Sequence, residues 1–408
     1  MKVLYTSPIL EHPPAGGPQL RIENSIIALN KVCELHVLSG VQKEKIGGAS
    51  AETFFQSNSS CFEYLPSSTL KLSNNRYIRK IQSVLRKLMI QWTIKNDANF
   101  IINYAEKNNI DILWIGYGNI SYPLIKEIKR KSPKHKIVCD TDSVWSRFVL
   151  RELPFISDPV RRRKIEKLGK LKEQEEKEWV NLCDVTTAVS EVDAIYYRSL
   201  TSNMKKIHLF SNVINLNSYK KKPSPPLGFK TPSIYLAGTF GHYNSPMDEA
   251  ARWVINKILP IVRNTIPDVN LYIVGRESDK FYGQLKDSRI YATGKVDTVL
   301  PYLYNTEVAL VPLKFESGTR FKILEAGACK IPIVSTTLGA EGIPVIDGKH
   351  VLIGDNEIDF ANAIIKLLKD RKLAKKLAQN CNQIINDQYS IETLSIEAEK
   401  ILSYLKES

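Results

Sequence analysis

The sequence predicts an α/β protein made of two Rossmann-like domains. Two observations support this fold class: short apolar strands alternate with helical segments twice along the 408 residues, and a stiff polar segment, 220–228, separates the two series. The length suits two or three domains that each bury a core. Hydrophobic residues make up 43% of the chain and charged residues 25%, which is ordinary for a soluble globular protein.

The first series contains short apolar runs that we expect to be buried parallel strands. They lie at 3–6, 35–38, 110–116, 136–140, 185–189 and 207–209, with helices between them and the first helix at 19–31. The mostly polar stretch 39–60 is expected to be a flexible loop. The second series has its strands at 234–236, 271–274, 290–293, 308–312, 331–335 and 351–353, and a last helix at 391–405. Ligands of such sheets bind at the carboxyl ends of the strands.

The segment after the strand at 308–312 carries the strongest functional signal. Gly318 allows a tight turn, Thr319 is a good N-cap, and an apolar helix then runs until just before Pro332. Arg320 and Lys322 at the start of this helix add positive charge to free backbone N–H groups, which suits a phosphate. One turn later, the carboxylate of Glu325 suits a pair of ribose hydroxyls. The alternative is that Lys322 and Glu325 form an ordinary surface pair.

These residues, from Gly318 to Pro332 with Gly339-Ala-Glu-Gly342 behind them, resemble the donor-site signature of the retaining glycosyltransferases of family 4. Further segments stand in the expected order: Gly16-Gly17-Pro18, Val189-Ser190-Glu191, Asn244 to Ala250, Val274-Gly275-Arg276, and Thr293 to Val296. The resemblance spans nearly the whole chain and is strongest over residues 234–385. It implies the GT-B fold, in which two Rossmann-like domains face an interdomain cleft.

The resemblance also implies domain roles and an activity. It implies an acceptor-binding domain at 1–222, a nucleotide-sugar-binding domain at 223–388, and a C-terminal helix at 389–408 that packs back on the first domain. The implied reaction moves a sugar from a nucleotide-sugar donor to a saccharide or lipid-linked saccharide, with retention of anomeric configuration, in bacterial surface polysaccharide synthesis. In the mechanism proposed for such relatives, the leaving phosphate helps to deprotonate the attacking hydroxyl.

The site residues carried over from the resemblance fall into two sets. The donor-binding set comprises Gly16, Gly17, Gly238, Glu316, Ser317, Gly318, Thr319 and Glu325, and the catalytic set comprises Arg320, Lys322 and Asp142. Many relatives hold the donor pyrophosphate with an Arg and a Lys shortly after the glycine turn at Gly238. Here His242, Tyr243 and Asn244 follow that turn, so we assign the task to Arg320 and Lys322.

The sequence departs from the family in two further places. The family has two Glu separated by seven residues, but the position that pairs with Glu325 is Ser317, and Glu316 is its neighbour. Which of these two replaces the first Glu stays open. Relatives often carry a His near the transferred sugar, where this chain has Asp140-Thr-Asp142. Asp142 is the nearest polar substitute, and it could orient either the acceptor or the donor.

The same Asp140-Thr-Asp142 matches the D-x-D pattern that holds a metal in another glycosyltransferase fold. That pattern is frequent by chance, and in GT-B enzymes protein groups supply the positive charge. We therefore expect no metal and no cofactor beyond the nucleotide sugar itself. Of the six histidines, His12 and His242 are the ones in loops expected to face the cleft, and none has ligand spacing to another.

The positive charge is concentrated in the first half of the chain. The net charge is +14, and residues 1–222 hold 35 Lys and Arg against 22 Asp and Glu, whereas residues 223–408 hold 22 against 21. This bias indicates an anionic partner for the first half.

Residues 74–95 combine helically spaced apolar residues, including Met89 and Trp92, with Arg76, Arg79, Lys80, Arg86, Lys87 and Lys95. This helix is either an interfacial anchor on an anionic membrane or an ordinary helix packed on its own sheet. The basic cluster at 161–172 is better explained as a solvated helix paired with nearby Glu residues.

The sequence also predicts where the protein is located, and it leaves two competing functions to consider. The first strand starts at Lys2, the six cysteines are scattered, and no apolar run reaches the ~20 residues of a membrane span, so we expect a cytoplasmic protein with peripheral contact at most with the inner membrane face. One competitor is a nucleotide-sugar epimerase with the GT-B fold. The other is a nucleic-acid-binding protein, but the basic residues lack a recognition motif or an aromatic stacking platform, so we expect no nucleic-acid partner.

Overall fold

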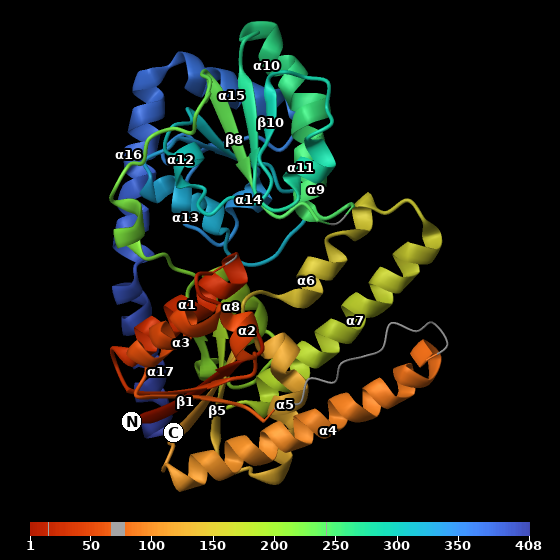
Figure 1. Cartoon of the computed structure of the whole chain (residues 1–408), viewed down its shortest axis with the longest axis vertical. Helices are drawn as coiled ribbons and strands as arrows, with labels where there is room; N and C mark the ends of the chain where they lie inside the picture. Colours follow the sequence, from red (N-terminus) through yellow and green to blue (C-terminus); the bar gives the residue numbers. More distant parts are fainter. Residues whose placement is uncertain (15, 67–77, 242) are drawn as a thin grey trace. The chain divides into compact units, whose positions relative to one another are not determined.

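The computed structural model describes residues 1–14, 16–66, 78–241 and 243–408. These residues form two compact units (Figure 1). Unit 1 comprises residues 1–146, 166–211 and 394–408, and unit 2 comprises residues 147–165 and 212–393. Each unit contains a parallel sheet with helices on both faces, as the alternation of strands and helices predicted. The roles of acceptor-binding and donor-binding domain stay predictions.

The sheet of unit 1 has seven strands in the order β3-β2-β1-β4-β5-β6-β7. The strands are β1 Lys2–Ser7, β2 Glu34–Ser39, β3 Cys61–Tyr64, β4 Ile112–Gly116, β5 Lys136–Asp140, β6 Val185–Ala188 and β7 Ile207–Leu209. β1 pairs with β2 on one side, with Val3 opposite Leu35, and with β4 on the other, with Val3 opposite Ile112. All residues of β4 are buried, which explains why this strand is a continuous apolar run rather than an alternating pattern. β6 is buried along its whole length as well, although two of its four residues are threonines.

The helices of unit 1 cover both faces of this sheet. They are α1 Gly17–Asn30, α2 Lys43–Ile46, α3 Gly48–Ser57, α4 Ile78–Lys107, α5 Gly118–Lys131, α8 Glu191–Arg198, the short η2 Met204–Lys206 and α17 Ile391–Glu407. α7, Pro159–Leu182, begins in unit 2 and continues into unit 1. One buried cluster joins α4, α5, α7 and α8 to the strands, with Ile101, Ile125, Trp179 and Tyr197 at its centre. α17 packs on the unit by its Glu397, whose carboxylate accepts hydrogen bonds from the backbone and hydroxyl of Ser211.

The expectation of a loop over residues 39–60 is wrong. α2 and α3 lie in this stretch, and α3 buries Ala51 and Phe55, which are four residues apart on one helix face. The ring of Phe55 stacks on Phe62 of β3 at 5.6 Å between centroids. Ala51 and Phe55 therefore attach α3 to the rest of unit 1, whereas most of its other residues are polar, so the sequence of this segment resembles that of a loop.

The sheet of unit 2 has six strands in the order β10-β9-β8-β11-β12-β13. They are β8 Ser233–Ala237, β9 Asn270–Val274, β10 Ile290–Ala292, β11 Val308–Val311, β12 Ile333–Ser335 and β13 Leu352–Ile353. β8 pairs with β9, with Ser233 opposite Asn270, and with β11, with Ile234 opposite Val308. β8 and β11 are thus the central pair, and their carboxyl ends lie at the same edge.

In unit 2, α9, the π-helical turn η4 and α10 form one continuous helix. They pack with α15 on one face of the sheet, whereas α13 packs with α16 on the other (Figure 1). The helical segments are α6 Trp145–Leu150, which starts in unit 1, η1 Leu153–Phe155, η3 Leu216–Tyr219, α9 Pro246–Trp253, η4 Val254–Ile258, α10 Leu259–Thr265, α11 Ser278–Tyr282, α12 Leu300–Leu303, α13 Phe321–Ala328, α14 Thr337–Ala340, α15 Glu357–Lys369 and α16 Arg371–Gln388.

Candidate functional site

The strand orders locate the binding edge of each unit. In unit 1 the order reverses between β1 and β4, and in unit 2 it reverses between β8 and β11. At such a reversal the loops after the two strands diverge and leave a crevice at the carboxyl edge, where ligands of open α/β sheets bind. In unit 2 the two loops are those that contain Gly238 and residues 316–320, so the topology brings two separately predicted segments to one edge.

The loop after β11 is a compact, buried turn. Ser317, Gly318, Thr319 and Arg320 are all buried, and Gly318 has φ of +80°, the left-handed region in which glycine is favoured. The prediction that Thr319 caps the helix is wrong. α13 begins at Phe321, and its N-cap is Arg320, which has an extended backbone and whose side chain makes no capping hydrogen bond.

Positive charge gathers at the start of α13, as the sequence predicted. Arg320 is buried, and its Nη1 donates a hydrogen bond to the carbonyl of Gly318 within the turn. Lys322 is half-buried, and burial lowers the pKa of its ammonium group, while the carboxylates of Glu316 and Glu325 oppose that shift. Lys322 donates no hydrogen bond to any residue in the described part of the chain. The amine therefore lies in a partly dry, mixed-charge setting in which an anionic ligand would strengthen its charged form.

Glu325 lies on the same helix and is bonded to a residue outside the motif. The hydroxyl of Tyr219, the last residue of η3, donates a 3.1 Å hydrogen bond to Glu325 Oε1. Burial raises the pKa of Glu325, and the charge of Lys322 and the Tyr219 hydrogen bond partly offset this rise. Because Glu325 is held by Tyr219, the alternative of an exposed Lys322–Glu325 surface pair does not describe this site.

Glu316 and Ser317 occupy different environments. Glu316 is half-buried, and its Oε1 accepts a hydrogen bond of 3.2 Å from the backbone N–H of Ser317. The hydroxyl Oγ of Ser317 is buried and has no hydrogen-bond partner among the described residues. A buried hydroxyl without a partner costs free energy unless something bonds it, so Ser317 is the better placed of the two to contact a ligand directly.

Gly238 lies directly after β8, at the same carboxyl edge of the sheet as the loop that follows β11. A Cβ on Gly238 would lie 2.7 Å from Cε of Met247 on α9, so the glycine allows the strand end to pack against that helix. Asn244 has φ of +59°, and Tyr243 is exposed with the Arg252 guanidinium 3.8 Å from its ring centroid. His242 lies outside the described residues. The donor contact of Gly238 stays a prediction.

In unit 1, Gly16 and Gly17 mark the start of α1 after β1. Gly16 is the N-cap, is exposed, and has an extended backbone that any residue can adopt. Among the described residues, the atom nearest to a Cβ on Gly16 would be Oε1 of Gln19, at 3.5 Å. The described neighbours therefore do not demand glycine at Gly16, and the donor contact of Gly16 and Gly17 stays a prediction.

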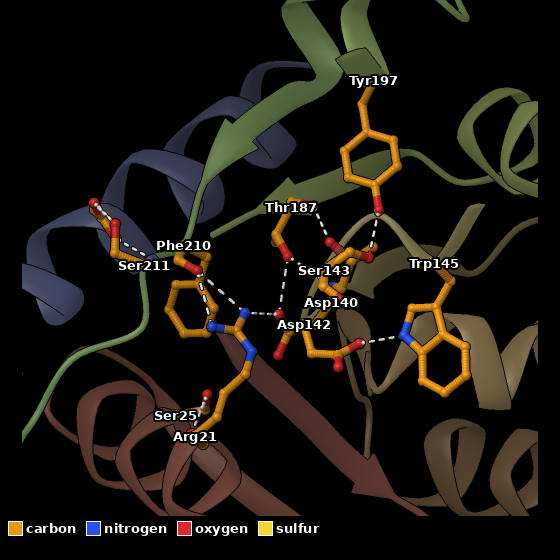
Figure 2. Close-up of polar contacts among 12 residues, drawn as sticks. Arg21, Ser25, Asp140, Asp142, Ser143, Trp145, Thr187, Tyr197, Phe210 and Ser211 are labelled. Carbon is orange, nitrogen blue, oxygen red and sulfur yellow. Dashed lines mark hydrogen bonds and ion pairs between the residues drawn. The ribbon is translucent and has the colours of Figure 1, made fainter. Parts of the chain in front are cut away.

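Asp140 at the end of β5 is part of a buried ion pair (Figure 2). Its Oδ1 lies 2.5 Å from Nη2 of Arg21 and accepts a 2.9 Å hydrogen bond from Thr187, and Arg21 also donates to the carbonyl of Phe210 at 3.1 Å. Asp140 is fully buried, and Arg21 neutralises its charge. The expectation that the D-x-D pattern holds no metal stays a prediction, and Oδ1 of Asp140 is already bonded by Arg21 and Thr187.

Asp142 points away from that pair and is bonded to the first residue of α6 (Figure 2). Trp145 Nε1 donates a 3.1 Å hydrogen bond to Asp142 Oδ1. Burial raises the pKa of Asp142 to about 6, although Trp145 and Arg21 both favour the carboxylate. Its loop is held by Tyr197, whose hydroxyl donates to the carbonyl of Ser143 at 3.0 Å. Asp142 is thus an oriented carboxylate that changes charge near pH 6.

Sequence reasoning missed three residues that the structure places beside the predicted ones. Tyr219 contacts Glu325, Arg21 pairs with Asp140, and Arg151 bonds both Glu341 and the backbone of Glu316. None belongs to a recognised motif. A tyrosine or arginine in an otherwise ordinary segment gives no signal of its partner. Over the described residues, no group of three or more His, Cys, Asp and Glu is arranged to hold a metal ion.

Comparisons with known proteins bear on the fold and on unit 2. The family model described as glycosyl transferases group 1 matches residues 233–370. The sucrose-phosphate synthase of Thermosynechococcus elongatus is similar over 100% of both chains, with a TM-score of 0.71 and 16% identity. Anabaena HepE, in a crystal structure with UDP and glucose, is similar over 99% of both chains, with a TM-score of 0.67 and 14% identity. The chain has the GT-B fold.

A sequence relative gives the remaining comparison. An uncharacterised 44.6 kDa protein in the cps region of Klebsiella pneumoniae is 29% identical over 146 residues, which are 34% of this chain and 38% of the relative. The match therefore spans well under half of either protein.

α4 contains most of the helix for which the sequence predicts a possible membrane contact. Within the described part of the chain, no helix is both long and apolar enough to cross a membrane. α4 continues the predicted helix 74–95, and its Ile90 and Trp92 are 50% and 54% exposed. Arg76 lies outside the described residues, and the structure does not describe the side chains of Arg79, Lys80, Arg86 and Lys87, so their predicted membrane contact stays a prediction.

Proposed function

We propose that this protein is a retaining glycosyltransferase that moves a sugar from a nucleotide-sugar donor to a saccharide or lipid-linked saccharide acceptor in bacterial surface polysaccharide synthesis. One observation carries the proposal. The glycosyl transferases group 1 match over residues 233–370 contains the β8–β11 crevice together with Arg320, Lys322 and Glu325. Two comparisons support a nucleotide-sugar donor and a role in polysaccharide synthesis: the HepE crystal structure contains UDP and glucose, and the Klebsiella relative comes from a cps region.

The donor contacts follow from the chemistry of each group. Lys322 supplies a point charge and Arg320 a buried guanidinium next to a turn of backbone N–H groups, which together suit a diphosphate. Glu325 uses Oε1 to accept from Tyr219 and keeps Oε2 for ribose hydroxyls. The Ser317 hydroxyl would gain the partner that it lacks among the described residues. Gly318 and Thr319 would contribute backbone contacts.

Arg320 and Lys322 would also act on the rate. As the sugar–phosphate bond breaks, negative charge grows on the departing diphosphate. Fixed cations in a partly dry site therefore stabilise the transition state more than they stabilise the bound ground state. Retention fits a mechanism in which a diphosphate oxygen takes the proton of the attacking hydroxyl on the same face of the sugar. Such a mechanism needs no protein nucleophile.

Asp142 would orient a hydroxyl of the acceptor or of the transferred sugar. Trp145 fixes its carboxylate, and a half-buried acceptor of hydrogen bonds suits a sugar hydroxyl. Gly16 and Gly17 would let a ligand approach the backbone at the start of α1 in unit 1. We propose that no metal is required, since Arg320 and Lys322 provide the charge and Arg21 occupies Asp140.

We also propose peripheral contact of α4 with an anionic membrane. Ile90 and Trp92 are large apolar side chains on a highly exposed part of this helix, Lys95 close by is exposed, and unit 1 comes from the basic half of the chain. A lipid-linked acceptor would lie at that surface.

Product analysis tests the proposed reaction. The protein is incubated with radiolabelled UDP- and GDP-sugars, with EDTA present, with and without saccharide and lipid-linked acceptors, and the anomeric configuration of the product is determined by NMR. Transfer with retention only when acceptor is present supports the proposal. Conversion of the donor sugar without acceptor would instead indicate an epimerase, and salt-sensitive retention of DNA or RNA without any transfer would indicate a nucleic-acid-binding protein.

A further inference from the structure

Arg151 joins three segments of unit 2 that are far apart in the sequence. It lies just after α6, in the segment 147–165. Its Nη1 donates to Glu341 Oε1 and its Nη2 to Glu341 Oε2, at 2.7 and 2.8 Å. The same Nη1 also donates a 2.7 Å hydrogen bond to the backbone carbonyl of Glu316. One guanidinium thus holds both the Gly339–Gly342 turn and the start of the loop at 316–320.

The contact to Glu316 falls at a sensitive point of that loop. The Glu316 carbonyl belongs to the peptide whose N–H is that of Ser317, so the Arg151 bond sets the orientation of this peptide plane. Ser317 belongs to this peptide, and Gly318 and Arg320 follow it within three residues. A second contact of the same segment lies one residue earlier, where the rings of Phe155 and Phe315 are 5.3 Å apart between centroids. Two side chains of the segment 147–165 therefore anchor the loop immediately before its phosphate-binding residues.

The Arg151–Glu341 pair has the features of an ion pair that fixes geometry. It is a bidentate pair of guanidinium and carboxylate, and each side chain is only 25% exposed. Parallel N–H···O bonds of this kind restrict orientation as well as distance. The pair also neutralises Glu341, whose carboxylate would otherwise be an uncompensated negative charge near a site that we assign to a diphosphate.

We propose that Arg151 is a positioning residue for the donor loop, which it holds through the Glu316 carbonyl while Glu341 holds Arg151. This inference rests on the proposed function, because it assigns the loop at 316–320 to the donor diphosphate. Arg151 does not touch the donor. It keeps the Ser317–Gly318 turn in the conformation that presents its N–H groups and Ser317 Oγ to the diphosphate.

The test separates the carbonyl contact from the ion pair. Arg151→Gln removes both, whereas the double variant Arg151→Glu with Glu341→Arg restores an ion pair but cannot donate to the Glu316 carbonyl from position 151. Arg263→Gln is the matched control. Arg263 forms a bidentate pair with Asp287 elsewhere in unit 2, with side chains 22% and 33% exposed.

Three quantities are measured for each full-length variant: the thermal midpoint, the Kd for UDP and for GDP by calorimetry, and hydrogen exchange of a peptide that covers residues 316–320. We expect Arg151→Gln to raise the Kd by about tenfold and to speed exchange in that peptide, since small displacements of a preorganised site are costly. We expect Arg151→Gln and Arg263→Gln to lower the thermal midpoint by similar amounts, and Arg263→Gln to leave the Kd unchanged. The double variant should recover the midpoint but not the Kd.

The outcomes distinguish the inference from the function on which it rests. A wild-type protein that binds neither UDP nor GDP and transfers no sugar contradicts the proposed function. A wild-type protein that binds one of them, with an Arg151→Gln variant that binds it equally well, overturns the role of Arg151 alone. Full recovery of the Kd in the double variant would also overturn it, because the ion pair and not the carbonyl contact would then matter.

Discussion

The hydroxyl of Tyr219 donates a 3.1 Å hydrogen bond to Oε1 of Glu325, across 106 residues of sequence. Tyr219 itself is fixed, since the hydroxyl of Tyr304 donates to its backbone carbonyl. Glu325 thus has one oxygen held by the protein and one left for a ligand. For a carboxylate proposed to bind a ribose, this arrangement fixes the direction in which the second oxygen points.

Tyr219→Phe should therefore weaken nucleotide binding although Tyr219 does not contact the nucleotide. Loss of a hydrogen bond to a carboxylate costs about 1.5–3 kcal/mol at most, and we expect the Kd for the donor nucleotide to rise by roughly tenfold. Calorimetry with the best-binding nucleoside diphosphate measures this change. Tyr291→Phe, which removes a hydroxyl of unit 2 that has no hydrogen-bond partner among the described residues, is the control, and an equal effect in both variants would argue against a specific role for Tyr219.

Lys322→Ala should lower kcat by about 100-fold, because the ammonium group would stabilise charge that develops on the leaving diphosphate. The KM should change less than kcat if this stabilisation is largest in the transition state. Initial rates over a range of donor concentrations measure both constants. Lys330→Ala removes an exposed lysine just beyond the same helix and should be neutral. A kcat of wild-type size in a folded Lys322→Ala protein contradicts the assignment.

The raised pKa of Asp142, about 6 against an ordinary 3.8, gives a pH prediction with a definite sign. The folded state favours the protonated carboxyl, so this group contributes stability below about pH 4 that is lost as pH rises through about 6. Asp142→Asn removes this pH-dependent loss of stability, because asparagine does not ionise, and its side-chain oxygen can still accept the hydrogen bond from Trp145 Nε1. Its thermal midpoint relative to wild type should therefore be higher at pH 7 than at pH 4, and kcat/KM of the wild type should fall below pH 6. A midpoint difference that does not vary with pH would show that Asp142 titrates normally.

Sedimentation with anionic vesicles tests the membrane proposal. We expect the wild type to sediment at low salt and Trp92→Ser with Ile90→Ser to remain in the supernatant, since the exposed apolar side chains would insert into the interface. Ile120→Ser is the control, because Ile120 is 47% exposed on α5. Equal sedimentation of all three proteins would mean that α4 is simply part of the fold.

Much of the fold could be predicted because its signals are local. The central strands of both sheets are mostly buried and apolar, and the predicted strands coincide with β1, β4, β8, β9 and β11 to within one or two residues. The errors have physical causes. α3 buries only Ala51 and Phe55, too few apolar residues to give a periodic pattern. Thr319 was expected to cap α13, but the left-handed Gly318 and the extended Arg320 delay the helix by one residue.

The candidate site was predictable only where one short segment contains it. Arg320, Lys322 and Glu325 fall within six residues, so a single motif indicates them. The partners that orient the site come from elsewhere: Arg151 and Glu341 are 190 residues apart, and Arg21 and Asp140 are 119 apart. Such pairs depend on how the strands are ordered in each sheet, which no local pattern specifies.

Calorimetric titration of UDP and GDP into wild-type protein and Glu325→Ala tests the central claim most directly. The claim is that the β8–β11 crevice binds the nucleotide of a nucleotide sugar. We predict that the wild type binds at least one of them and that Glu325→Ala, with an unchanged circular dichroism spectrum, binds it roughly 100-fold or more weakly, since ribose hydroxyls lose a charged partner worth about 2–4 kcal/mol. Equal affinity in a folded Glu325→Ala protein would contradict the account.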